Sequence, residues 1–124
     1  MSTIMTQPNG GLNGAGALLS AGSITGDEVC NMHDEKLGKI QDIMLDMAEG
    51  TIRYVVLSAG GFLGIGDRLF AVPWKALTLD RENQRFMLDV DVERLKKAPG
   101  FNKDQWPDMA DTSWNTSIES YYAR

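Results

Sequence analysis

The feature that most constrains the fold is a series of short segments between residues 23 and 90, in which strand-forming residues are separated by tight turns. Within 37–47, Ile43, Leu45 and Met47 lie at every second position, and this period of two is typical of a β-strand with one covered face. The segments predicted to be strands are 23–31, 37–47, 51–59, 68–72, 76–79 and 86–90. We therefore expect a mainly β domain.

Local signals refine this pattern. Ile40 is out of phase with the apolar face that follows it, which indicates a β-bulge near Gln41. Residues 48–50 end in Gly50, and glycine supplies the positive φ that a short hairpin loop needs. Apolar residues occupy both faces in 54–57, as in a strand that is covered on both sides.

Two helices are expected near the C-terminus. Asp91 is placed to cap a first helix, which Pro99 ends. A second helix is expected to begin at Asp111 or Thr112.

Six short strands on one small domain predict a closed or partly open β-barrel, because closure removes exposed strand edges.

These elements divide the chain into three parts. Residues 1–17 are rich in glycine and small polar residues, and we expect them to form a flexible N-terminal tail. Residues 18–98 are expected to form the barrel domain, and residues 99–124 a C-terminal helical extension. The length of 124 residues suits one domain with one core.

Charge and hydropathy restrict the partners. The formal net charge of −5 disfavours a broad nucleic-acid-binding face and adsorption to an anionic membrane, since both surfaces are negatively charged. No apolar run is long enough to cross a bilayer, so membrane insertion is not expected. The start of the chain lacks the positive charge and apolar stretch of a secretory signal, and we expect a cytoplasmic protein.

The sequence predicts no catalytic, cofactor-binding or metal-binding set. Cys30 is the only cysteine and His33 the only histidine. We interpret Cys30 as a small buried residue and His33 as a solvated turn residue. A nucleophile–base pair would need His33, and nothing in the sequence indicates an oxyanion hole near Cys30 and His33.

Two groups of residues are candidates for an interface. Phe62, Leu63 and Ile65 lie on a glycine-rich loop that lacks the Gly-Lys-Ser/Thr of a phosphate cradle. If exposed, they mark a protein contact; otherwise they pack over the barrel mouth. The second group is the C-terminal aromatic set, which either forms a partner-binding surface or docks the last helix onto its own barrel. Its members are Trp106, Trp114, Tyr121 and Tyr122.

Four motifs together resemble the PRC-barrel family. They are Leu37-Gly38-Lys39-Ile40 with Asp42, Tyr54-Val55-Val56-Leu57-Ser58, the loop from Gly60 to Asp67, and Phe70-Ala71-Val72-Pro73-Trp74. The family includes the cytoplasmic domain of the photosynthetic reaction centre H subunit, the C-terminal domain of a ribosome-maturation factor, and stand-alone bacterial proteins. The resemblance covers roughly residues 18–98 and is greatest to the stand-alone group, mostly described as stress-associated or uncharacterised.

The resemblance implies a compact β-barrel that serves as an interaction module, with no family-wide catalytic residues and no cofactor. The main hypothesis is a non-enzymatic module for interaction and assembly that associates with itself or with another protein. The alternative is a small-ligand or metal-binding barrel with Cys30, His33 and acidic residues lining one end. An enzyme of unrecognised type and a role in RNA binding rank behind these two.

Overall fold

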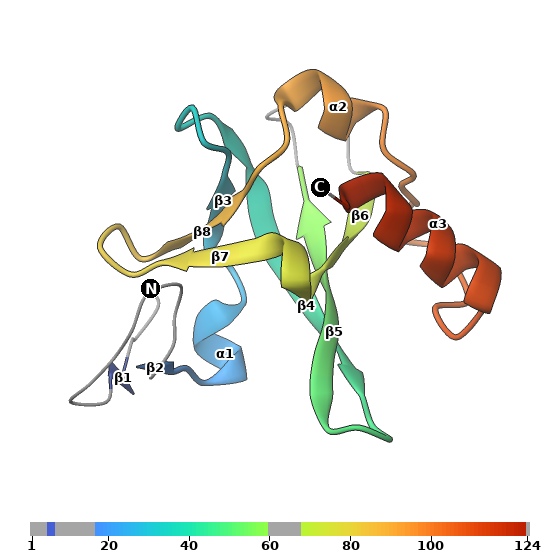
Figure 1. Ribbon diagram of the computed structural model, residues 1–124, viewed down its shortest axis with the longest axis horizontal. Coiled ribbons are helices and arrows are strands. Elements are labelled where there is room, and N and C mark those ends of the chain that lie inside the picture. The colour runs from blue at the N-terminus through green and yellow to red at the C-terminus, as the bar shows by residue number, and fades with distance from the viewer. Residues whose placement is uncertain (1–4, 7–16, 60–67, 124) are drawn as a thin grey trace.

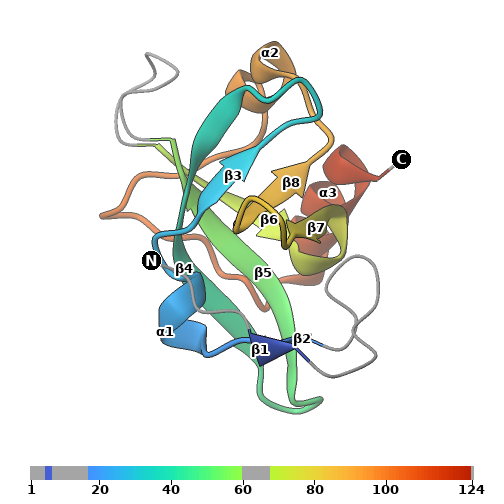
Figure 2. The same ribbon diagram turned by 90° about the vertical axis from the view of Figure 1, so that its left-hand side faces the viewer.

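A curled sheet of six strands forms the body of the protein. The computed structural model describes residues 5–6, 17–59 and 68–123. The strands of the sheet are β3 (Glu28–Cys30), β4 (Lys36–Asp46), β5 (Thr51–Ser58), β6 (Leu69–Pro73), β7 (Leu77–Asp80) and β8 (Arg85–Leu88). The sheet curls into half a barrel, and short C-terminal helices lie beside it (Figures 1 and 2). The expected mainly β, barrel-like fold is confirmed in its partly open form.

The order of the strands explains the curl. The sheet runs β6-β5-β4-β3-β8-β7, so β6 and β7 are its two edges. These edges follow each other in the chain and are joined only by the short 3-10 helix η2 (Trp74–Ala76). Because three residues span the connection, the sheet must bend until its edges approach each other. Neighbouring strands are antiparallel, except that β3 pairs in parallel with β8.

Strand β4 is the longest strand and carries the predicted irregularity. Its register with β5 shifts between Ile40 and Asp42, which confirms a bulge near Gln41. A second shift lies between Met44 and Leu45, where the pairing moves from Tyr54 to Ile52. The hairpin turn ends at Gly50 with φ +70°, as expected for a short loop.

The beginning of the described chain differs from the prediction. A strand over 23–31 was expected, but Ser23 lies in helix α1 (Ala21–Ile24) and β3 begins only at Glu28. Ser20 caps α1, since its hydroxyl oxygen accepts a hydrogen bond from the Ser23 amide at 3.2 Å. The two-residue strands β1 (Met5–Thr6) and β2 (Ala17–Leu18) pair with each other. Most of the predicted tail, 1–17, lies outside the described residues.

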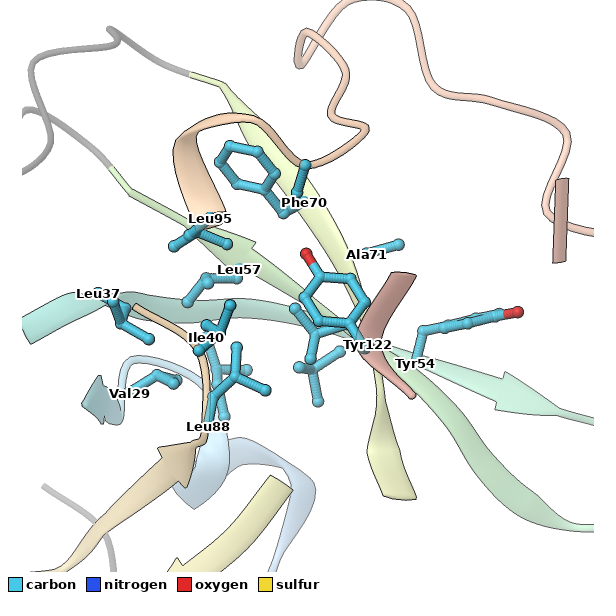
Figure 3. Packing of buried hydrophobic residues seen from close by; sticks show 14 of the residues in the cluster. Val29, Leu37, Ile40, Tyr54, Leu57, Phe70, Ala71, Leu88, Leu95 and Tyr122 are labelled. Carbon is cyan, nitrogen blue, oxygen red and sulfur yellow. The ribbon is translucent and has the colours of Figure 1, made fainter. Parts of the chain in front are cut away.

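The core lies on the concave side of the sheet and under its covering helices. Residues Tyr54 to Leu57 are all buried, which confirms a strand covered on both faces. Figure 3 shows buried side chains from strands β3, β4, β5, β6 and β8 and from the C-terminal helices. They include Val29, Leu37, Ile40, Leu57, Phe70, Leu88, Leu95 and Tyr122. This single cluster joins the barrel to the helices that follow it.

Both predicted C-terminal helices are present. The Asp91 carboxylate accepts from the Arg94 amide at 2.7 Å and caps α2 (Val92–Lys96). The Asp111 carboxylate caps α3 (Thr112–Tyr122) in the same way. Helix α3 lies against edge strand β6, and a β-bridge from Leu69 to Phe101 adds cover to that edge.

Gly38, in the Leu-Gly-Lys-Ile motif, makes a close backbone contact. A Cβ atom at this position would lie 2.3 Å from the Ser58 carbonyl oxygen. We predict that Gly38→Ala lowers the free energy of unfolding by about 2–4 kcal/mol, because backbone in two paired strands would have to move. Chemical denaturation of wild type and variant measures this difference.

Gly22→Ala is the matched control, since a Cβ at Gly22 meets no atom within 4 Å. Gly22 lies in helix α1, and we expect its replacement to be neutral or to stabilise by up to about 1 kcal/mol. Equal effects of the two substitutions would show that the β4–β5 contact at Gly38 does not limit side-chain size.

Candidate interaction surface

Trp114, one of the aromatic residues predicted to form an interface, packs within its own chain. Its ring meets the Tyr54 ring edge-on, with 5.4 Å between centroids. Beside it the Tyr54 hydroxyl donates a hydrogen bond to Asn115 Oδ1. The Asn115 side-chain amide in turn donates to the carbonyl oxygens of Met109 (3.1 Å) and Asp111 (2.9 Å). Burial, the main cause, raises the pKa of Tyr54, and the network fixes α3 on strand β5.

Tyr121 joins the two C-terminal helices. The Arg94 guanidinium lies 4.4 Å from the centroid of the Tyr121 ring and donates to the Tyr121 carbonyl. The Tyr121 hydroxyl donates to the Arg94 carbonyl at 2.5 Å. These reciprocal contacts connect α2 to the end of α3. Whether Trp114 and Tyr121 also contact a partner stays a prediction.

Tyr122 is the last residue of α3, and its side chain is buried in the core (Figure 3). Its hydroxyl has no hydrogen-bond partner among the described residues. Burial raises the pKa of Tyr122 well above its ordinary value of 10. The ring therefore contributes apolar packing, while the hydroxyl adds an uncompensated desolvation cost.

Trp106 remains the most accessible of the predicted C-terminal interface residues. Its side chain is 40% exposed, and its ring lies 5.2 Å from the Phe101 ring, centroid to centroid. Its indole N–H donates to the Lys103 carbonyl at 2.9 Å. The other three predicted interface residues, Phe62, Leu63 and Ile65, lie outside the described residues.

The β4–β5 hairpin presents an apolar surface that the sequence analysis did not single out. Leu45 is 59% exposed and Met47 is 83% exposed. Figure 1 shows that the turn of this hairpin extends beyond the neighbouring elements at the bottom of the view. The alternation of Ile43, Leu45 and Met47 was visible in the sequence. The exposure of Leu45 and Met47, in contrast to the partly buried Ile43, was not, because it depends on how far the hairpin extends past the core.

A cleft of about 530 Å³ lies beside the turn end of this hairpin, lined there by Asp46, Glu49 and Thr51. Arg53 lies between two acidic residues of the cleft. Its guanidinium nitrogens are 3.7 Å from carboxylate oxygens of Asp46 and of Glu119. Lys75 also lines the cleft. The walls thus present charges of both signs, without a single-sign field that would select one class of small ion.

Cys30 and His33 occupy different environments. Cys30 is buried in β3, whereas His33 is exposed in the turn before β4. The Asn31 side-chain oxygen accepts from the His33 and Glu35 amides, at 2.9 and 3.0 Å, and so organises this turn. Within residues 5–6, 17–59 and 68–123, no group of three or more His, Cys, Asp or Glu side chains is arranged to hold a metal ion. None of the helices described here is long and apolar enough to cross a membrane.

Removing the Asn115 side chain tests the network that holds α3. We predict that Asn115→Ala lowers the free energy of unfolding by about 2–3 kcal/mol, because it leaves the buried Tyr54 hydroxyl without an acceptor. Urea denaturation followed by tryptophan fluorescence measures the loss. The neighbouring exposed substitution Thr116→Ala should change stability by less than about 0.5 kcal/mol. A loss at Asn115 no larger than at Thr116 would contradict this account.

The unpaired Tyr122 hydroxyl gives the opposite expectation. We predict that Tyr122→Phe raises the free energy of unfolding by about 1 kcal/mol at neutral pH, since it removes a buried polar atom without a partner. Tyr121→Phe removes a hydrogen bond that is made, and should lower it by a similar amount. Thermal and chemical denaturation of both variants make the comparison, and destabilisation by Tyr122→Phe would show that the hydroxyl is satisfied.

The same residue predicts a pH dependence. The pKa of Tyr122 is raised in the folded state, so the unfolded state loses this proton first. Below about pH 10 the Tyr122 hydroxyl keeps its proton in both states, so this group adds no pH dependence. As the pH rises further, ionisation favours the unfolded state and the free energy of unfolding declines. Denaturation between about pH 8 and 11.5 should show a shallower decline for Tyr122→Phe than for wild type. Parallel declines would contradict the buried, neutral hydroxyl.

Comparison with known proteins agrees with this architecture. The family model described as the PRC-barrel domain matches residues 18–95, which is more than half of the chain. The match contains the curled sheet from β3 to β8 and most of α2. Comparison with curated protein sequences finds no match. On the extent of the family match, the chain belongs to the PRC-barrel domain family.

Proposed function

We propose that this protein is a non-enzymatic interaction module that associates with itself. The PRC-barrel is a fold found in interaction and assembly modules, and the exposed apolar side chains of the β4–β5 hairpin are the observation that carries the proposal. Leu45 and Met47 lie at the projecting end of a hairpin whose base is built into the core. A rigid support with an apolar tip suits protein recognition.

The internal packing of the C-terminal helix supports the same choice. Trp114 and Tyr121 use their rings and polar atoms within the chain. Trp106, Leu45 and Met47 are among the exposed large apolar side chains of the described surface, together with Leu18 and Met32. The stress-related role implied by stand-alone PRC-barrel proteins, and the expected cytoplasmic location, remain predictions.

A small-ligand function is the second candidate. It is favoured by the cleft of about 530 Å³, which has the size of a small-molecule site. Its mixed charges around Arg53 suit a zwitterionic or peptide-like ligand better than a simple anion or cation. The exposed side chains of Leu45 and Met47 have no role in this alternative, because they do not line the cleft.

Light scattering coupled to size-exclusion chromatography tests self-association. We predict that the mass rises from near the chain mass of 13.7 kDa towards twice that value as the loaded concentration increases from about 10 µM to about 1 mM. A reversible shift is expected because a small apolar tip gives a modest interface. A constant monomer mass over this range would contradict self-association and move attention to a different protein partner or to the cleft.

A further inference from the structure

We propose that two copies of this chain meet along the outer edge of β4, antiparallel, with Leu45 of each copy facing Leu45 of the other. The inference rests on the proposed self-association and names the surface that would carry it. It assigns the contact to residues 43–47. The C-terminal aromatic residues Trp106, Trp114, Tyr121 and Tyr122 are not part of this contact.

The outer edge of β4 changes character at Ile40. Up to that point it is paired, since Glu28 lies opposite Lys39 and the Ile40 backbone exchanges hydrogen bonds with Gly26 and Asp27. Beyond Ile40, β5 is the sole strand paired with β4 in the described part of the chain. The second half of β4 is therefore an edge to which another strand can add.

The backbone at this edge is oriented for pairing. The Ile43 amide donates to the Asp42 carboxylate at 2.8 Å, so this amide does not donate into the β4–β5 ladder. In an antiparallel strand the outward-facing residues alternate, and Leu45 follows Ile43 in this series. The register with β5 shifts between Met44 and Leu45 by one extra residue on β5, Arg53. The alternation along β4 then assigns the Leu45 amide and carbonyl to the outer edge.

The side chains on this edge are self-complementary about Leu45. Ile43 and Leu45 lie on one face of β4, because side chains alternate along a strand. Ile43 packs partly against the core, and the exposed Met47 follows β4 in the turn. An antiparallel pair centred on Leu45 pairs residues 44–46 of the two copies and brings Ile43 of each copy towards the turn residue Met47 of the other. Six apolar side chains then form one cluster, and the same patch serves both copies, as a two-fold interface requires.

Charge selects this register over its neighbour. Centring the pair on Met44 would place Asp42 opposite Asp46 of the second copy, and directly opposed like charges are destabilising. Centring it on Leu45 places Asp46 opposite Met44, while Asp46 keeps Arg53 of its own chain nearby at 3.7 Å. The apolar and the acidic positions thus favour the same alignment.

Asp42 limits the strength of the contact. Its carboxylate occupies the Ile43 amide, and this bond has to be exchanged for one to the second copy. Asp42→Ala should therefore tighten the association about three- to tenfold, by removing the competing acceptor. Sedimentation velocity over a concentration series measures the change in dissociation constant.

A disulfide crosslink tests the register directly. Directly opposed residues of paired strands have Cα atoms about 5.5 Å apart, within the range that a disulfide spans. Leu45→Cys should form a covalent dimer under mild oxidation, visible on a non-reducing gel. Cys30, the one native cysteine, is buried, so it does not compete. Met32→Cys is the control, because Met32 is 54% exposed but lies on the turn before β4.

The outcomes separate this inference from the proposed function. Efficient crosslinking of Leu45→Cys, with little for Met32→Cys, supports the β4 contact. A wild type that dimerises by light scattering while Leu45→Cys does not crosslink, or crosslinks no better than the control, overturns the contact and leaves self-association standing. A wild type that stays monomeric, with no crosslink at Leu45, overturns both. Leu45→Asp, checked for folding by circular dichroism, should weaken a β4-mediated dimer at least tenfold.

Discussion

The structure depends on how its two sheet edges are covered. Strands β6 and β7 are joined by the short η2 segment, so the sheet curls but leaves a seam between its edges. Helix α3 lies against β6 and places Tyr122 in the core. The C-terminal segment is thus part of the packing unit, even though the family match ends at residue 95. Edge strand β6, buried along its whole length, is closed to further pairing.

A further strand edge lies in the middle of the strand order, where β4 extends past β3. Strand β4 has eleven residues, more than its neighbour β3 can pair with. The residues of β4 beyond Ile40 form the outer half of the β4–β5 hairpin. The base of this hairpin contains the bulge near Gln41 and the buried residues Tyr54 to Leu57 of β5. Exposure of Leu45 and Met47 follows from how far the hairpin extends past the core. A partly apolar, unpaired edge suits assembly, whereas Trp114, Tyr121 and Tyr122 pack within their own chain.

Much of this architecture was predictable from local sequence signals. Periodicity located β4 and β5, Gly50 marked their turn, and Asp91 and Asp111 marked two helix starts. The Ser20 cap of α1 was missed because Ile24 and Val29 also fit a strand pattern. The parallel pairing of β3 with β8 and the exposure of Leu45 depend on contacts between distant segments, which no local pattern contains. The predicted interface residues Phe62, Leu63 and Ile65 remain untested by the structure.

Hydrogen–deuterium exchange at low and high protein concentration is the most direct test of the central claim that copies meet at the outer half of β4. Exchange reports the protection of individual backbone segments. The account predicts that amides in 41–47 exchange more slowly at high concentration, while those of the already buried strand β6 do not change. Unchanged exchange in 41–47, together with new protection in another segment, would contradict it.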